Sequence, residues 1–361
     1  MTVRCLHVVS GDLWAGAEVS ALHLIRELHG REGMRVHALV LNEGTLHDRL
    51  VAAGIPTSVL PESRLSFPRL VREGLGEARK LRPDVVHSHR YKEHLLGSAM
   101  SLAASARHVR TAHGLPPELE WRGGLVGAGS LADDLVSDWA GSTWIAVSAD
   151  LARRLDGVRR RVHVVPNGLP AEAPPARRDV LGDAFGDAEP SWIIGFVGRL
   201  EHVKRPDRFL RVLAMLPESV AGRRVRGVVL GDGSLRRDLE SRAGDRVSFL
   251  GSREDGESLV GALDVLVIPS DHEGHPMVLL EAMRAGVPVV ASAVGGIPEV
   301  LGRSPWIVEP EDERGMASAV ARLLAEPDAR DEWSRRLAAR FASRYTIAAT
   351  ADRVLEVYAD A

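Results

Sequence analysis

The chain has 361 residues, of which 45% are hydrophobic and 26% are charged, and its formal net charge is -3. This length is enough for two hydrophobic cores, so we expect two domains. Because 46 basic residues face 49 acidic ones, no overall positive field favours nucleic acid, and nucleic-acid binding is disfavoured.

The single cysteine, Cys5, lies in an apolar run and has no intrachain partner for a disulfide. No apolar stretch approaches the ~18 residues of a membrane span, and the first residues do not open a signal peptide. A reducing cytoplasm is therefore the expected setting, and any membrane contact is expected to be peripheral.

Strand and helix patterns alternate through the first half of the chain. We expect strands at residues 3–9, 35–41, 57–60, 85–89, 108–113 and 143–148, with helices between them that include 17–30, 67–81, 92–105 and 131–140. This alternation predicts a doubly wound parallel sheet, a Rossmann-like domain over residues 1–168. The Gly- and Pro-rich segment 114–130 is too long for a routine connection and is expected to border a cleft.

Residues 169–190 carry little periodic apolar pattern and are predicted to be the interdomain linker. A second alternation follows, with strands expected at 192–197, 227–230, 247–250, 264–269, 287–291 and 306–308. It predicts a second Rossmann-like domain over residues 191–344. From residue 312 onward the pattern is helical only, with breaks at Pro327 and residues 344–346.

The stretch 264–292 has the pattern of a parallel strand-loop-helix-strand unit. Pro276 sits where a helix favours its first residue, the helix is expected over 277–285, and Gly286 suits a left-handed end. The preceding loop then lies at the carboxyl end of its strand, where open α/β sheets bind ligands.

Two carboxylates belong to this unit: Glu273 lies on the loop and Glu281 in the second turn of the helix. Across a loop-helix junction they can contact two parts of one ligand. For Glu281 the alternative is a surface ion pair with Arg284 at i+3, worth only a few tenths of a kcal/mol.

Two cations follow the first strand of the second half. Arg199 comes just after the strand and Lys204 just before a helix that starts at Pro206, so both side chains can reach one point above the sheet. A diphosphate fits that point, since fixed cations stabilise the charge on a departing phosphate. The alternative is that both are solvated surface charges.

Several common site patterns are absent from the sequence. It has no G-x-G-x-x-G or Walker sequence, no H-E-x-x-H, no Asp-x-Asp and no His/Cys cluster with ligand spacing. We therefore expect no metal ion and no cofactor. His87 and His89 are expected to point to opposite faces of their strand and to be structural.

A family resemblance is carried by motifs along nearly the whole chain: GAE at 16–18, DVVHSH at 84–89, TAHG at 111–114, VVPNG at 164–168, GFVGRLEHVKRPD at 195–207, VLGDGSLR at 229–236, VSFLG at 247–251, EGHPMVLLEAMRAGVPVVAS at 273–292 and VGGIPEV at 294–300. They resemble the retaining, nucleotide-sugar-dependent glycosyltransferases of family 4. The resemblance implies the GT-B fold, two Rossmann-like domains facing across a cleft, with a last helix (345–361) that returns to the first domain.

The resemblance also implies roles for individual residues. Glu281 would accept hydrogen bonds from the ribose hydroxyls, and Glu273 from the transferred sugar. His113, which ends a strand in the first domain, would help to orient the sugar and the reacting centre. The implied catalytic set is His113, Arg199, Lys204 and Glu273, and the implied donor site adds Gly16, Leu250, Gly274, His275, Pro276, Met277, Val278 and Glu281.

Three further features belong to this implied donor site. Leu250 would contact the nucleobase through backbone groups, so side chains there do not reveal which base is bound. The Gly295–Gly296 turn would let the backbone approach the donor; the alternative is a simple tight turn. His272 and His275 replace the aromatic or apolar residues more usual in the family.

The expected activity is transfer of a sugar from a UDP- or GDP-type donor to an acceptor hydroxyl, with retention, in glycan, polysaccharide or glycolipid synthesis. A nucleotide-sugar 2-epimerase of the same architecture and a non-catalytic donor-binding protein are the alternatives. The nucleobase, sugar, acceptor and oligomeric state stay open. The basic, amphipathic pattern of residues 67–82 suggests a helix that contacts the inner face of a membrane peripherally, where a lipid-linked acceptor would lie. The alternative is an ordinary helix with a solvated polar face.

Overall fold

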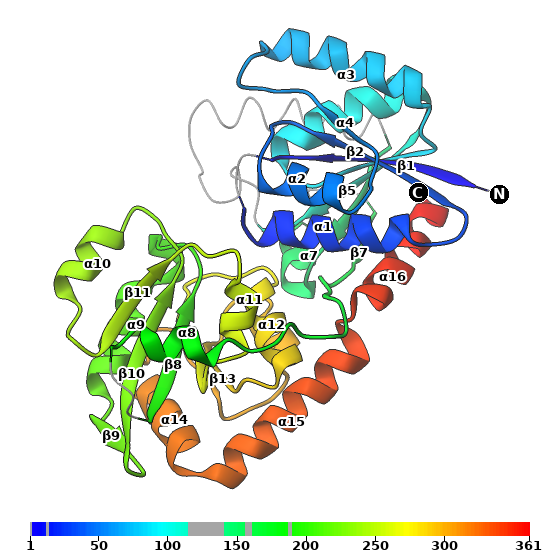
Figure 1. Cartoon of the computed structure of the whole chain (residues 1–361). Helices are drawn as coiled ribbons and strands as arrows, with labels where there is room; N and C mark the ends of the chain where they lie inside the picture. Colours follow the sequence, from blue (N-terminus) through cyan, green and yellow to red (C-terminus); the bar gives the residue numbers. More distant parts are fainter. Residues whose placement is uncertain (1, 12–13, 115–140, 156–160, 187–189) are drawn as a thin grey trace. The chain divides into compact units, whose positions relative to one another are not determined.

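The chain forms two compact units. A computed structural model describes residues 2–11, 14–114, 141–155, 161–186 and 190–361 (Figure 1). The first unit comprises Met1–Leu169 and Ile347–Ala361, and the second comprises Pro170–Thr346.

The first unit is built on a parallel sheet with the strand order β3-β2-β1-β4-β5-β6-β7. Its described elements are β1 (Val3–Val9), α1 (Gly16–His29), β2 (Met34–Val40), α2 (Thr45–Ala52), β3 (Thr57–Val59), α3 (Phe67–Leu81), β4 (Val85–Ser88), α4 (Tyr91–Ala104), β5 (Arg107–Ala112), β6 (Thr143–Ala146), α7 (Ala149–Leu155), β7 (Val162–Val164) and α16 (Ile347–Asp360). The order reverses at β1, as in dinucleotide-binding folds, so the carboxyl ends of β1 and β4 flank the switch point where such sheets bind ligands.

Alternating side chains of β1 bury both faces of this sheet. Cys5 and Val9 pack in the core that includes α1 and α16, whereas Leu6 and Val8 pack in the core that includes α3 and α4. Figure 1 shows α16 alongside α1, although the two helices lie at opposite ends of the chain. The last helix is thus an integral part of the first unit.

The second unit has a parallel sheet with the order β11-β10-β8-β12-β13-β14, and β9 pairs antiparallel with β10. Its described elements are α8 (Arg178–Asp183), β8 (Ser191–Val197), the 3-10 turn η1 (His202–Lys204), α9 (Pro206–Met215), β9 (Ser219–Val220), β10 (Arg223–Leu230), α10 (Arg236–Arg242), β11 (Val247–Gly251), α11 (Gly256–Val260), β12 (Val265–Ile268), α12 (Met277–Ala285), β13 (Val289–Ser292), α13 (Ile297–Leu301), β14 (Ile307–Val308), α14 (Glu313–Ala325) and α15 (Pro327–Arg344). The two parallel α/β sheets confirm the predicted fold class.

Several elements have the predicted bounds. β1 and α3 begin and end where the pattern placed them, and α12 spans the expected residues. Gly286 ends α12 in the left-handed conformation, with φ 68°. Pro276 differs by one position, because it is the N-cap, in extended backbone, and not the first helical residue. The helix expected at 131–140 and nearly all of segment 114–130 lie outside the described residues.

Two other segments differ from the expectation. The strand expected at 247–250 is β11, and its first four residues are only half-buried because β11 is an edge strand. The segment without a periodic pattern contains the short helix α8. There Arg178 donates hydrogen bonds to the Ser191 carbonyl and to the Asp264 carboxylate, at 2.7 and 2.8 Å, and these bonds fasten α8 to the second unit.

Candidate functional site

The loop between β12 and α12 holds a lysine-glutamate pair. Lys204 Nζ lies 2.6 Å from Glu273 Oε2, and the Ser270 hydroxyl donates to Glu273 Oε1 at 2.7 Å. Glu273 is 6% exposed and the Lys204 side chain 25%. A mostly buried carboxylate is thus held from both of its oxygens, beside a cation that keeps access to solvent.

Arginines from α9 and the residue before it fasten this loop. Arg208 is buried, donates to the Pro269 carbonyl at 2.6 Å and pairs with Asp271 at 2.9 Å. Arg205, with φ 52°, pairs with the same aspartate at 3.1 Å. The Asp271 amide donates to the Val203 carbonyl at 2.9 Å, so the loop and the η1 turn that carries Lys204 are one connected structure.

The turn after β13 lies directly against Glu273. The Gly296 amide donates to the Glu273 carbonyl at 3.1 Å. Gly295 has φ 53°, and a Cβ there would overlap the same carbonyl oxygen. Glycine is therefore required at 295 for packing of the turn on the loop, as the tight-turn alternative expects.

Glu281 is half-buried in the second turn of α12. Burial raises the pKa of its carboxyl to about 8, the negative charge of Glu257 adds to the rise, and Arg284 opposes it. Arg284 forms its ion pair with Glu257, at 2.7 Å, and no bond in the described residues joins Arg284 to Glu281. The carboxyl of Glu281 remains open to a ligand.

The other predicted donor residues in this unit differ in their exposure to solvent. Arg199 is exposed two residues after β8, and in the described residues no hydrogen bond or ion pair links it to Lys204 or Glu273. Leu250 is half-buried in the edge strand β11. The remaining predicted donor residues belong to the loop and the first turn of α12. Gly274 and Val278 are partly accessible, while Pro276 and Met277 are buried.

The two loop histidines differ in their surroundings. His275 is 5% exposed, its ring centroid lies 5.5 Å from that of Tyr345, and burial lowers its pKa to about 4. His272 is half-buried, and its Nε2 is shielded from solvent without a hydrogen-bond partner among the described residues. His275 is thus a buried, neutral ring that packs near Tyr345.

In the first unit, charged groups gather after β1 and β4. Gly16 is exposed and begins α1. The buried Glu18 accepts a hydrogen bond from the Ala15 amide at 3.2 Å and pairs with Arg90 at 3.2 Å. Burial raises the pKa of Glu18, while Arg90 opposes the rise. Both groups lie at the carboxyl edge of the sheet, where a ligand is expected.

His113 and Glu93 belong to the same edge. Burial lowers the pKa of His113 to about 3, with a further lowering by the positive charge of Arg90. Its Nδ1 is shielded from solvent and has no hydrogen-bond partner among the described residues. Burial raises the pKa of Glu93, which is 1% exposed. His113 is therefore a neutral imidazole with one unused nitrogen.

The expectation that His87 and His89 point to opposite faces of their strand was wrong. Residues i and i+2 of a strand point to the same face, and the two rings stack with centroids 4.4 Å apart. His7 joins them because β1 and β4 pair in register at His7 and His87. Ring nitrogens of all three lie within 4.8 Å of one another, a cluster that sequence spacing did not indicate.

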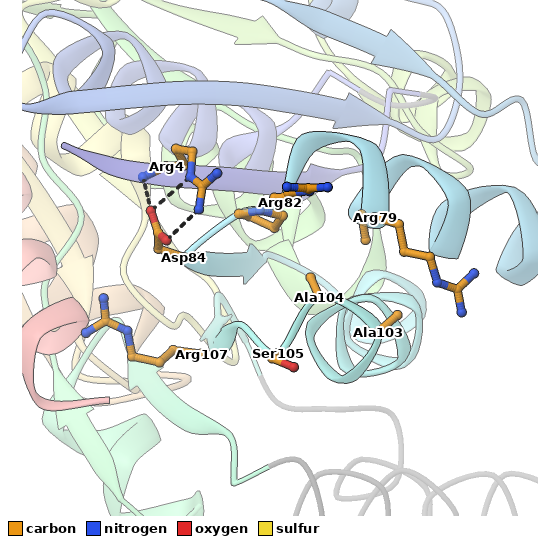
Figure 2. A pocket seen from close by; sticks show the side chains of 10 residues that line it. Arg4, Arg79, Arg82, Asp84, Ala103, Ala104, Ser105 and Arg107 are labelled. Atoms are coloured by element: carbon orange, nitrogen blue, oxygen red, sulfur yellow. Dashed lines mark hydrogen bonds and ion pairs between the residues drawn. The ribbon is translucent and has the colours of Figure 1, made fainter.

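One pocket of the first unit lies at the other edge of its sheet. Its volume is about 710 Å³, and its lining includes Arg4, Asp84 and Arg107 at or beside the amino ends of β1, β4 and β5. Arg4 pairs with Asp84 at 3.0 Å, and Arg107 donates to the Tyr358 carbonyl. Figure 2 shows Arg79 and Arg107 directed away from each other. These cations do not converge on one ligand position.

Sequence reasoning missed Ser270, Arg208, Glu18, Arg90 and Glu93. Of these, Glu18 had a signal, because it belongs to the quoted GAE motif. The others had none, since their partners come from other elements of the fold.

Comparisons with known proteins bear on the whole chain. The profile described as "Glycosyltransferase Family 4" matches residues 14–173, and that described as "Glycosyl transferases group 1" matches residues 191–326. A D-inositol 3-phosphate glycosyltransferase of Mycolicibacterium smegmatis is 31% identical over 77% of this chain and 67% of its own length. The chain belongs to the family 4 glycosyltransferases.

Other relatives of this glycosyltransferase match to different extents. The 2-deoxystreptamine glucosyltransferase of Streptomyces kanamyceticus is 37% identical, over 49% of each chain. The putative glycosyltransferase EpsF of Bacillus subtilis is 30% identical, over 80% of this chain and 79% of its own. The chain thus spans about half the length of the first of these relatives and more of the second.

Solved structures show the fold. HepE of Anabaena in complex with UDP-glucose has a TM-score of 0.84 and 20% identity over 99% of this glycosyltransferase and 100% of HepE. Sucrose-phosphate synthase of Thermosynechococcus elongatus has a TM-score of 0.75 and 19% identity over 99% and 98%. The two parallel α/β units are those of the GT-B fold.

Proposed function

We propose that the protein transfers a sugar from a nucleoside-diphosphate sugar to an acceptor hydroxyl, with retention of the anomeric configuration. The observation that carries the proposal is the Lys204–Glu273 pair, held at 2.6 Å at the carboxyl edge of the second sheet. A cation there would stabilise the charge of the departing diphosphate. The neighbouring carboxylate would accept hydrogen bonds from the sugar hydroxyls.

The donor-binding role of α12 follows from Glu281. At pH 7 the neutral carboxyl of Glu281 offers one O–H donor and one carbonyl acceptor, which suits the two ribose hydroxyls of a nucleotide. Arg199, which is free of bonds to Lys204 and Glu273, would add a second cation to the diphosphate. Leu250 would contact the nucleobase through its backbone.

The first donors to test are uridine nucleotides, because HepE was crystallised with UDP-glucose. A thermal-shift screen with UDP, GDP, ADP and their sugars measures binding directly, since a ligand of the folded state raises the melting temperature. We expect one nucleotide series to raise it and the others not to. No shift with any of them would contradict the proposal.

Retention and independence of metal are separate parts of the proposal. Because the resemblance to family 4 implies it, we propose a front-face displacement in which the leaving phosphate oxygen helps to take the acceptor proton. Proton NMR of the first product formed shows its anomeric configuration. We expect the configuration of the donor, and turnover unchanged by EDTA; an inverted product or loss of turnover with EDTA would exclude these parts.

Incubation with donor alone tests the two alternatives. A nucleotide-sugar 2-epimerase would convert the donor without an acceptor, and a binding protein would leave it intact with every acceptor. We expect transfer only when an acceptor is added. The first acceptors are D-inositol 3-phosphate and 2-deoxystreptamine, the compounds in the names of two relatives.

Peripheral membrane contact through α3 is a further proposal, for a lipid-linked acceptor. Leu70 and Ala78 of α3 are buried, while Phe67 is 56% exposed. Two of its basic residues are offset by acids, since Arg69 and Lys80 pair with Glu73 and Glu77. None of the described helices is long and apolar enough to cross a bilayer. Flotation with anionic liposomes tests the contact, and binding that salt does not weaken, or no binding, would exclude it.

A further inference from the structure

A continuous line of side chains, all buried except the half-buried His113, leads from Tyr358 in the last helix to His113. The Tyr358 hydroxyl lies 2.7 Å from His87 Nδ1 and 3.4 Å from His7 Nε2. His7 Nδ1 lies 3.0 Å from His89 Nε2, and His89 Nδ1 lies 3.4 Å from His113 Nε2. In each contact one group must donate and the other must accept. The position of the proton on one side chain therefore determines the position of the proton on the next.

All members of this line are neutral at pH 7. Burial lowers the pKa of His7 to about 3 and holds the pKa values of His87 and His89 well below their usual range. Burial also raises the pKa of the Tyr358 phenol well above its usual value. Each imidazole therefore carries one N–H and one lone pair.

The Tyr358 phenol sets the direction of the hydrogen bonds along this line, because it has a single hydrogen to donate. A contact of 2.7 Å is a normal hydrogen bond from a hydroxyl, whereas 3.4 Å is long, so the hydrogen of Tyr358 points to His87 Nδ1. His87 then carries its proton on Nε2 and donates to the Thr111 hydroxyl, at 2.7 Å.

The remaining protons follow in order. His7 Nε2 faces the Tyr358 oxygen, whose hydrogen is used, so this nitrogen carries the proton and His7 Nδ1 is bare. His89 must then donate from Nε2 to His7 and accept at Nδ1. The donor to His89 is His113 Nε2–H, which leaves the lone pair on His113 Nδ1.

We propose that Tyr358, His7 and His89 fix His113 as the Nε2–H tautomer, so that its Nδ1 accepts a hydrogen bond from a ligand hydroxyl. Nδ1 is the nitrogen that has no partner among the described residues. Tyr358 is thus a positioning residue that acts on His113 through two other imidazoles. The tautomer is independent of the proposed function; only the identity of the hydroxyl, as one of the sugar or the acceptor, rests on it.

The opposite proton order is less favourable. It would direct the only phenol hydrogen along the 3.4 Å contact to His7 and would leave an N–H of His87 as the donor at 2.7 Å. A metal ion is the other possible occupant, since His7, His87 and His89 offer nitrogens within 4.8 Å. However, all six of their ring nitrogens already face another side chain.

Nitrogen NMR of the free protein labelled with [15N]histidine tests the tautomer at pH 7. The signals of His113 are those lost in His113→Ala. We expect the Nε2–H pattern in the wild-type protein, and a mixture of both tautomers in Tyr358→Phe, where the directing hydroxyl is absent. Cys5→Ala is the matched control, because Cys5 contacts the same hydroxyl at 3.3 Å without belonging to the line; it should keep the wild-type pattern.

An Nδ1–H or doubly protonated His113 in the wild-type protein would overturn the proposal, even if Tyr358→Phe does not fold. An unchanged tautomer in a folded Tyr358→Phe would overturn the role of Tyr358. Shifts of His7, His87 and His89 together on adding one equivalent of Co²⁺ would show a metal site in its place. If the wild-type tautomer is as expected but no donor is turned over, only the proposed function fails.

Discussion

Lys204 Nζ and Glu273 Oε2 lie 2.6 Å apart although their residues are 69 positions apart in the chain. The pair keeps a mostly buried carboxylate neutralised in the free protein. A bound diphosphate would compete with Glu273 for the same ammonium group. The pair is therefore the first target for mutation.

Lys204→Ala should lower kcat by roughly 100-fold, because loss of one group that stabilises developing charge costs about 3 kcal/mol. Steady-state kinetics with the donor found by thermal shift measures this. Lys80→Ala is the matched control, since Lys80 is an exposed lysine of α3 that pairs only with Glu77 among the described residues. Equal kcat values for the two variants would remove Lys204 from the reaction.

Glu281→Ala should weaken nucleotide binding by roughly 2- to 10-fold at pH 7, where the carboxyl is mostly neutral, since a hydrogen bond between neutral groups contributes about 0.5–1.5 kcal/mol. Isothermal titration with the nucleoside diphosphate measures the change. Glu332→Ala, on the exposed face of α15, should bind like the wild-type protein. Wild-type affinity in Glu281→Ala would show that the ribose lies elsewhere.

Glu281 should also affect the pH dependence of stability. Its pKa is about 8 in the folded protein against 4.5 as the ordinary value, so between these pH values the folded state holds one more proton than the unfolded state. The free energy of unfolding should therefore fall as pH rises from about 4.5 to 8. Glu281→Gln removes this contribution, and its advantage over the wild-type protein should grow across that range in urea unfolding.

A substitution at Glu332 is also the control for this pH dependence of stability. Glu332→Gln should keep the wild-type slope, because its carboxylate is exposed in the folded state. Parallel curves for the wild-type protein and Glu281→Gln would mean that the Glu281 carboxyl is not desolvated.

Gly295→Ala and Gly286→Ala separate backbone strain from packing. Both glycines have positive φ, 53° and 68°, but a Cβ at Gly286 meets nothing within 4 Å, whereas one at Gly295 would overlap the Glu273 carbonyl. Gly286→Ala should cost about 1–2 kcal/mol from strain alone. Gly295→Ala should cost more in urea unfolding and also weaken donor binding, because Glu273 must move. Equal costs would contradict the close packing of the turn.

The elements around the site were predictable from local pattern. The apolar spacing of α12 and the glycine at 286 determine where this helix begins and ends, and the βαβ order places the loop before it at the carboxyl edge. Contacts between elements were not predictable. The approach of Lys204 to Glu273 depends on the hydrogen bond from the Asp271 amide to the Val203 carbonyl, which joins two loops that are far apart in sequence.

The histidine cluster also depends on contacts between elements that the sequence does not reveal, and one part of it was predicted wrongly. The two-residue period of a strand places His87 and His89 on one face, so their stacking followed from the sequence alone. Their contact with His7 depended on the register between β1 and β4, and that with Tyr358 on the return of the last helix. Neither can be read from residue spacing.

The place of α16 in the first unit also constrains how the protein is made. A ribosome completes the first sheet long before it adds Ile347, Val354 and Tyr358, which the core on one face of that sheet requires. The intervening 170–346 region has its own sheet and can fold while synthesis continues. The first unit therefore keeps apolar surface uncovered until α16 has emerged from the exit tunnel.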